Sequence, residues 1–202
     1  MTFQPPELHS AKPIGYLSKR TMKFVSENMG RAEEACSVSC CLSNAPRDAL
    51  SLWRHNAMGL YSSETLALSV IPPEEDPAAY EFYSYFMTPI AFDEDGEPRD
   101  LNDEENRTML EAAKYVEAMS SDYLQLGWDI VSNSLGWSDG QVLECSPLTC
   151  NGLAREIDTN RHGLIDGLDR AFAVTPQIIR GPSEPGTYFL VQVWRKSATT
   201  PR

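Results

Sequence analysis

The stretch YEFYSYFMTPIAF, residues 80–92, decides the class of this fold. Its aromatic residues favour a β-strand, and Pro89 marks an edge or a bulge, because proline cannot donate to a sheet ladder. A second strand of the same character, GTYFLVQVW at 186–194, follows the turn-forming sequence GPSEPG. Shorter strands are expected in IGYLSK and LGWDIVSNS. The chain is therefore expected to build a sheet around two long aromatic strands.

The clearest helix signal lies between these two strands, in LNDEENRTMLEAAKYVEAMSSDYL. Asn102 followed by Glu105 is the capping-box pattern that starts many helices. Apolar residues then recur at helical spacing and define one face, which includes Met109, Val116 and Tyr123. We therefore predict a continuous helix over 102–124 whose apolar face packs on the core.

Two shorter helices are expected, each upstream of a long strand. Residues 62–71, SSETLALSVI, are followed by two prolines that end the helix. Residues 164–174, LIDGLDRAFAV, have Asp166 as the expected N-cap, and this helix is predicted to stop before Pro176.

Two cysteine frames, CSVSCC at 36–41 and CSPLTC at 145–150, indicate that the chain repeats itself. The first cysteines of the two frames are as far apart as the second ones: Cys36 with Cys145, and Cys41 with Cys150. Further matches follow in the same order at nearly the same separation: Arg54-His55 with Arg161-His162, and Phe82 with Phe189. Rare residue types that agree in order and spacing are typical of an internal duplication.

The expected fold is α+β, with two duplicated half-units joined by the long helix. Each half-unit consists of a strand, a cysteine-bearing strand, a short helix and a long aromatic strand, over residues 14–92 and 126–195. Together they form one compact domain of 202 residues. The remaining segments are a flexible arm at 1–12, an acidic connector at 93–106, a linking helix at 107–125 and a tail at 196–202.

The composition excludes several classes of partner. With 29 acidic and 17 basic residues the formal net charge is −12, which opposes nonspecific binding to nucleic acid or to an anionic membrane. The same charge suits a basic protein partner. No apolar run reaches the ~20 residues of a membrane span, and the N-terminal MTFQPPELHSAKP lacks the apolar segment of a secretory signal. We therefore expect a cytoplasmic protein with no membrane or nucleic-acid partner.

The cysteines allow four interpretations. In the preferred one they are small buried residues of strands, a common environment of free cysteine. The others are disulfides, a nucleophilic thiol with a histidine base, and a metal site formed by Cys36, Cys41, Cys145 and Cys150. Positions five apart point to opposite faces of a strand, so core packing is preferred and no metal or cofactor is expected. The chain also lacks a glycine-rich phosphate loop and the HExxH and GxSxG motifs, so no catalytic residue is assigned.

The most suggestive stretch for binding is LWRHNAMGLY, which brings together Trp53, Arg54, His55 and Asn56. An indole ring for stacking and a guanidinium for a carboxylate or phosphate are typical of a ligand pocket. Arg161 and His162 are the counterparts in the second half-unit. The alternative is that both Arg-His pairs close loop-to-helix junctions through hydrogen bonds.

Acidity and the absence of catalytic motifs favour a non-enzymatic protein-binding module, inhibitor-, immunity- or antitoxin-like, acting on a basic protein partner. The alternative is a small enzyme or ligand-binding protein that uses the Arg-His pairs and the cysteines. The first hypothesis predicts carboxylates concentrated on one exposed face and no deep pocket. The second predicts a histidine that converges with a cysteine or carboxylate in a cleft.

Overall fold

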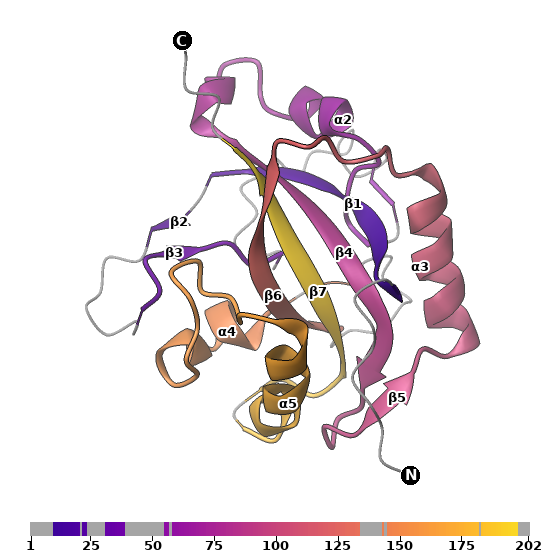
Figure 1. Ribbon diagram of the computed structural model, residues 1–202. Helices are drawn as coiled ribbons and strands as arrows, with labels where there is room; N and C mark the ends of the chain where they lie inside the picture. The colour runs from indigo at the N-terminus through magenta and orange to yellow at the C-terminus, as the bar shows by residue number, and fades with distance from the viewer. Residues whose placement is uncertain are drawn as a thin grey trace.

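The computed structural model describes residues 10–20, 22–23, 31–38, 55–56, 58–133, 143, 145–181 and 183–197. Within these ranges the chain is a mixed α+β fold built on a five-stranded antiparallel sheet (Figure 1). Four strands lie in the order β1-β4-β7-β6, and β5 pairs with β4. Their bounds are β1 Lys12–Lys19, β4 Glu81–Phe92, β5 Pro98–Asp100, β6 Tyr123–Asn133 and β7 Thr187–Lys196. The short strands β2 Met22–Lys23 and β3 Glu34–Ala35 pair separately from this sheet.

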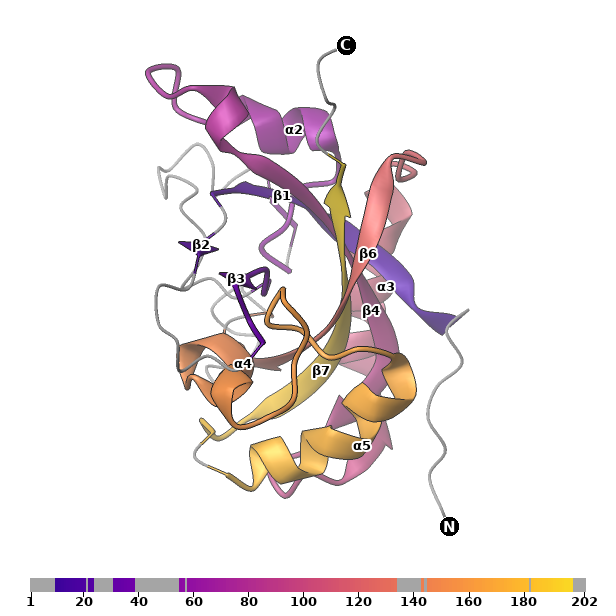
Figure 2. The ribbon, with the colours of Figure 1, turned by 60° about the vertical axis from the view of Figure 1, so that its left-hand side comes forward.

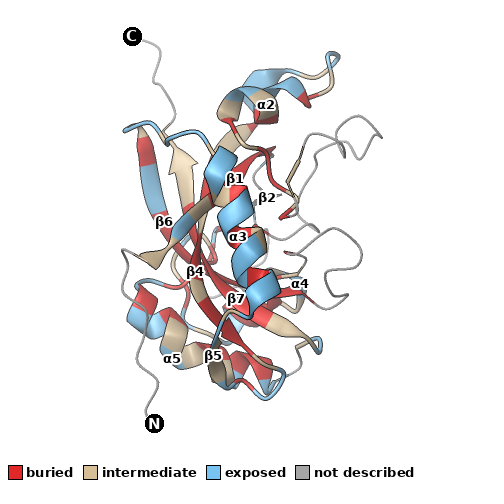
Figure 3. Cartoon of the chain, turned by 90° about the vertical axis from the view of Figure 1, so that its right-hand side faces the viewer, coloured by how far each residue is buried: buried red, intermediate tan, exposed pale blue. Residues whose placement is uncertain are grey.

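The helices lie around the curved sheet, with β2, β3 and α4 on one side of it and α3 along the other (Figures 1 and 2). Helix α3 turns a row of exposed residues outward and buries Met109 and Ala112 on its inner side (Figure 3). Within the described ranges, no helix has the length and apolar character needed to cross a membrane. The α-helices are α2 Glu64–Ser69, α3 Asp103–Tyr115, α4 Pro147–Cys150 and α5 Leu168–Ile179, and the 3-10 turns are η3 Pro77–Ala79 and η5 Leu153–Arg155.

The two long aromatic strands predicted from the sequence are confirmed, and they form the centre of the sheet as β4 and β7. The ladder between them shifts register between Met87 and Ala91, so Pro89 lies at an irregularity, as proline in a central strand must. Their side chains Tyr83, Tyr85, Tyr188 and Phe189 are fully buried. Burial of such rings is the main source of stability in a core of this kind.

The predicted capping box of α3 is confirmed, but the predicted continuous helix over 102–124 is wrong in its second half. Asn102 accepts hydrogen bonds from the backbone of Glu104 and Glu105, and the Glu105 carboxylate accepts from the Asn102 N–H. The helix ends at Tyr115, and Tyr123 begins β6, where it pairs with the end of β7. Pairing with a central strand satisfies the backbone of this segment, and this tertiary contact outweighs the apolar period of the sequence.

The helix predicted to stop before Pro176 instead continues through it to Ile179. Proline lacks an N–H to donate within the helix, which costs stability. The last turn offsets this by burying Ile178 and Ile179 against the sheet. The N-cap is Gly167 rather than Asp166, whose carboxylate accepts a hydrogen bond from Asn160 instead.

The two cysteine frames do not form equivalent strands. Residues 147–150 of the second frame are helical, with Pro147 at a helix start, where it is well tolerated. Cys36 directly follows β3, and residues 39–41 of the first frame lie outside the described residues. The prediction that residues 36–41 and 145–150 form equivalent strands is therefore wrong.

A turn that begins at Asn56 ties the chain to β1. The Asn56 side-chain N–H₂ donates to the carbonyl of Ile14 at 2.8 Å. Its side-chain oxygen accepts from the backbone N–H groups of Met58 and Leu60, at 2.9 and 3.2 Å. Tyr61 then forms an isolated bridge with Tyr16 of β1.

A second turn, at Asn160, makes the same contacts with β6. The Asn160 side-chain N–H₂ donates to the carbonyl of Leu126 at 2.7 Å. Its side-chain oxygen accepts from the backbone N–H groups of His162 and Leu164, at 2.9 and 3.3 Å. Ile165 then bridges to Trp128 of β6. One asparagine therefore organises each turn in the same way.

The strands that receive these turns also correspond. Gly15 on β1 lies opposite Tyr85 on β4, and Gly127 on β6 lies opposite Val193 on β7, each beside a register shift. Tyr85 and Val193 pair with each other at the centre of the sheet. In the order β1-β4-β7-β6, each of the two edge strands that receive a turn, β1 and β6, thus lies next to one of the two long central strands. This correspondence does not match His55 with His162, because His55 precedes the asparagine of its turn and His162 follows the asparagine of the other. It does not match Phe82 with Phe189 either, because Tyr85 corresponds to Val193, and the two strands are then offset by one residue from the predicted match.

Candidate functional site

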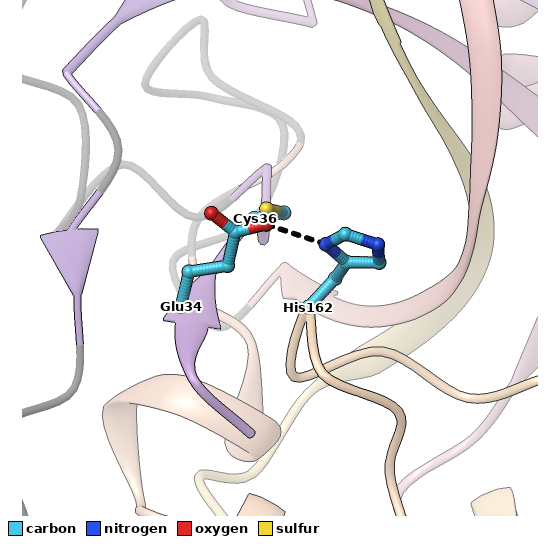
Figure 4. Close-up of side chains that lie close together, drawn as sticks. All are labelled: Glu34, Cys36 and His162. Atoms are coloured by element: carbon cyan, nitrogen blue, oxygen red, sulfur yellow. Dashed lines mark hydrogen bonds and ion pairs between the residues drawn. The ribbon is translucent and has the colours of Figure 1, made fainter. Parts of the chain in front are cut away.

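The segment at β3 is joined by its backbone to the turn that carries the second Arg-His pair. The N–H groups of Glu33 and Glu34 donate to the carbonyl of Arg161 at 2.8 and 3.1 Å. The Cys36 N–H donates to the carbonyl of His162 at 3.1 Å. These bonds place the side chains of Glu34, Cys36 and His162 side by side, although they come from distant parts of the sequence (Figure 4).

Glu34 is the centre of this group. Its Oε1 lies 2.5 Å from His162 Nδ1 and accepts from Arg195 Nη1 at 2.9 Å. Burial raises the pKa of Glu34, but the hydrogen bond from His162 and the charge of Arg195 outweigh it and leave the pKa below its ordinary value. Glu34 is therefore held as a carboxylate between two basic groups.

Cys36 is completely buried and is held as a neutral thiol. Burial raises its pKa to about 11, although the nearby charge of Lys19 opposes the shift. Tyr83 Oη donates to its sulfur at 3.7 Å, and Arg195 Nη1 lies 3.9 Å from the same atom. Because the thiolate is the nucleophilic form of cysteine, this environment does not support nucleophilic catalysis.

Glu34, Cys36 and His162 also have the donor types of a zinc site, and one donor atom of each lies within 4.8 Å of the others. The Arg195 guanidinium already contacts both the Glu34 oxygen and the Cys36 sulfur. A dication bound there would meet this positive charge, so the arrangement favours an internal ion pair over a metal. Of the four cysteines named from the sequence, Cys41 lies outside the described residues, Cys145 is half-buried and Cys150 is exposed.

A second buried polar group lies next to the first, centred on Asp129 of β6. Its carboxylate accepts from Ser37 Oγ at 2.5 Å, from Ser146 Oγ at 2.6 Å and from the Val38 N–H at 2.9 Å. Burial raises the pKa of Asp129, and these hydrogen bonds oppose the shift. Ser37 of the first cysteine frame and Ser146 of the second thus donate to the same carboxylate, and the two frames are connected through Asp129.

Lys19, at the end of β1, completes the buried network. Its ammonium donates to the carbonyl of Ser37 and lies 4.5 Å from the centre of the Tyr83 ring. Burial lowers its pKa to about 8, while the charge of the Asp129 carboxylate acts in the opposite direction. Completely buried lysines are rare unless they are paired, so this residue belongs to the site rather than to the general core.

The other residues predicted to bind are dispersed. Trp53 and Arg54 lie outside the described residues, and Asn56 shapes its turn. His55 Nδ1 contacts the Asn56 carbonyl at 2.8 Å, and its buried Nε2 has no hydrogen-bond partner among the described residues. Arg161 is exposed and pairs with Glu33 at 3.0 Å. His162 therefore joins Glu34 and Cys36 instead of its predicted counterpart, and the binding roles of these residues stay a prediction.

A cavity of about 790 Å³ opens at one end of the sheet, and we call it the seam cavity because β4 and β7 pair there. Arg195 lines this cavity and also bonds to Glu34, so the seam cavity adjoins the buried network. Its lining residues are Glu64, Pro77, Ala78, Tyr80, Glu81, Phe82, Leu124, Leu126, Arg195, Lys196 and Ser197.

The chain matches no protein-family model, no curated protein and no solved structure.

Replacing Glu34 tests how this charged group contributes to stability. Glu34→Gln is expected to lower the free energy of unfolding at pH 7 by about 2 kcal/mol, because Arg195 and His162 lose a charged partner. Since the folded-state pKa lies below the ordinary value of 4.5, this advantage of the wild type is present above that pH. It is lost as the pH falls through the folded-state pKa.

Urea unfolding of both proteins at pH 7 and at acidic pH checks this prediction, and the two stabilities should converge on acidification. A difference that is the same at both pH values would show that the Glu34 charge is not linked to folding.

Proposed function

We propose that this protein binds a small ligand in the seam cavity. The observation that carries the proposal is that Arg195 lines the cavity and reaches the buried group of Glu34, Cys36 and His162. The volume of about 790 Å³ lies within the range of known ligand sites. Apolar side chains with a few charged groups line the cavity, as in most small-molecule sites. The proposal keeps the ligand-binding alternative inferred from the sequence, but the described lining of the cavity contains neither the Arg-His pairs nor a cysteine.

Binding is favoured over catalysis by the state of the groups nearest the cavity. Cys36 is protonated and shielded from solvent. Burial lowers the pKa of Arg195, but its surroundings, including the Glu81 carboxylate, raise it overall, so Arg195 does not exchange a proton near neutral pH. A cavity wall of this kind recognises a ligand through charge and shape.

We further propose that the cavity lies at the junction of two related halves, 14–92 and 126–195. The support is the pair of asparagine turns, with the same hydrogen bonds to β1 and to β6. The sheet order, symmetric about the β4–β7 pair, supports it as well. A ligand site at the contact between two similar units is common, because each unit supplies one wall.

A cavity-filling variant tests ligand binding. Ala78 lines the seam cavity and is exposed, so Ala78→Trp should fill the cavity without disturbing the core. The neighbouring Ala79 is equally exposed but is not part of the lining, so Ala79→Trp is the matched control. In a fragment screen by ligand-observed NMR, compounds that bind the wild type should lose binding at least tenfold in Ala78→Trp and keep it in Ala79→Trp. Fragments that bind Ala78→Trp as well as wild type, or a screen without hits, would contradict the proposal.

A second candidate function is binding to a basic protein, as an inhibitor- or immunity-like module. The observation that favours it is a group of exposed carboxylates on the β4–β5 loop, at the end of β5 and at the start of α3: Glu94, Asp95, Asp100, Asp103 and Glu104. A surface rich in carboxylates speeds association with an oppositely charged partner. Replacing these residues by their amides should abolish capture of a basic partner from the source cell, and capture by the wild type should weaken with salt. A cytoplasmic location is part of this proposal.

A further inference from the structure

We infer that the seam cavity selects a small zwitterion with an apolar side group, of which an apolar α-amino acid is the simplest example. The inference rests on the proposed function, because it names the ligand class of the same cavity. It is drawn from how the charges of the wall are arranged.

The wall of the cavity carries two cations and two carboxylates, arranged in unlike pairs. Lys196 Nζ lies 2.5 Å from Glu64 Oε1, and Arg195 Nη1 lies 3.5 Å from Glu81 Oε1. All four side chains are only partly exposed, between 20% and 41%. The net charge of the wall is therefore zero, but a ligand in the cavity would contact individual positive and negative charges.

Such a wall discriminates against ligands with a single charge. An anion that bonds to Arg195 would weaken its contact with Glu81 and leave that carboxylate with the hydrogen bond from Tyr83 Oη at 2.8 Å but a weaker cationic partner, in a partly desolvated site. A cation at Glu81 would repel Arg195 and weaken its contact with that carboxylate, while Arg195 keeps its hydrogen bond to Glu34 at 2.9 Å. A neutral apolar ligand would remove water from both charges and supply no hydrogen bonds in return.

A zwitterion gives each wall charge an unlike partner. The carboxylate of an α-amino acid accepts from Arg195, and its ammonium donates to Glu81. The two ligand charges share one carbon, so they need wall charges that are close together, and the separation of 3.5 Å between Arg195 and Glu81 meets this requirement. Lys196 and Glu64 repeat the pattern and would suit a second polar group of a larger ligand.

The rest of the wall is apolar and has room for a side group. Pro77, Tyr80, Phe82 and Leu126 contribute to it together with Leu124, which is 60% exposed in the free protein. A large exposed leucine in the lining of a cavity is typical of a binding site, because an apolar ligand group that covers it removes apolar surface from water. An aliphatic or aromatic side group would therefore lie against these residues.

Three related compounds test the inference on the wild-type protein by isothermal titration calorimetry. L-Leucine carries both charges, N-acetyl-L-leucine lacks the ammonium and L-leucinamide lacks the carboxylate. Leucine is expected to bind at least tenfold more tightly than either analogue. Equal binding of leucine and one of its analogues overturns the zwitterion inference.

Glu81→Gln provides a sharper test, because it should reverse the preference. The cavity wall then has an excess positive charge, so N-acetyl-L-leucine should bind at least as tightly as leucine. Glu94→Gln, an exposed carboxylate on the β4–β5 loop outside the cavity, is the matched control and should keep the wild-type order. An unchanged preference in Glu81→Gln overturns the inference.

The outcomes also separate the inference from the proposed function. If no amino acid binds but fragments still bind in a manner that Ala78→Trp blocks, the zwitterion inference fails and the cavity remains a ligand site. If neither class binds, both proposals fail together. Because the analogue series uses the wild type, a loss of folding in Glu81→Gln does not affect it.

Discussion

Asp129→Ala is expected to lower the free energy of unfolding by about 4 kcal/mol, the largest effect of any substitution in the buried network. The carboxylate is completely buried and accepts from two serine hydroxyls and from the backbone N–H groups of Val38 and Ile130. Without it these donors have no acceptor, and each buried unsatisfied donor costs about 1–3 kcal/mol. Lys19 also loses a nearby opposite charge. Removing the cost of burying the carboxylate offsets part of this loss.

Chemical denaturation of three variants checks the prediction. Asp129→Asn keeps one acceptor oxygen but turns an amide N–H₂ toward the donors, so its loss should be intermediate. Asp169→Ala removes an exposed carboxylate in the first turn of α5 and should cost less than about 1 kcal/mol. A cost for Asp129→Ala as small as that of Asp169→Ala would show that the serines find other acceptors.

Gly15→Ala and Gly127→Ala should each lower the free energy of unfolding by about 3 kcal/mol, from backbone strain and steric overlap together. Both glycines have a positive φ, +142° and +147°, which residues with a side chain rarely adopt. A Cβ at Gly15 would lie 2.6 Å from Leu60 Cβ, and one at Gly127 would lie 2.9 Å from Leu164 Cβ. The neighbours belong to the two asparagine turns, so each substitution would push a turn away from its strand.

Gly59→Ala is the matched control for this pair. Gly59 also has a positive φ, +75°, but an added Cβ would meet no atom of the described residues within 4 Å. Its cost should therefore be the conformational part alone, about 1 kcal/mol. Thermal and urea unfolding of the three variants should place Gly15→Ala and Gly127→Ala together, well below Gly59→Ala. Widely different costs at positions 15 and 127 would count against two related halves.

The four long strands β1, β4, β6 and β7 could be predicted from the sequence because their signals are local, whereas β2, β3 and β5 were not predicted. The aromatic runs that became β4 and β7 have few alternatives to a buried strand. The prediction of a helix over 102–124 was wrong in the part of the segment that pairs with a strand distant in the sequence. Its apolar spacing continues to Tyr123, but the segment from Tyr123 pairs with β7, which is some seventy residues away in the chain. Neither spacing nor capping residues carry that information.

The candidate site was predicted only in part. His162 was chosen from its sequence context, and it does join a charged group, although with Glu34 and Cys36 rather than with His55. The residues that sequence reasoning missed are Glu34, Lys19, Asp129 and Arg195. For Asp129 a signal was present in the sequence. It is a charged residue inside the apolar strand LGWDIVS, and a charged residue must find a partner when it is buried.

The sequence by itself determined the α+β class, the central strands and the capped start of α3, because these depend on neighbours a few residues apart. The predicted duplication stays a proposal, because the two cysteine frames differ in structure. The similar hydrogen bonds of Asn56 to β1 and of Asn160 to β6 became visible only in the structure. The tertiary structure alone decided which charges meet in the interior and where a cavity opens, since both depend on contacts between segments that the linear order keeps far apart.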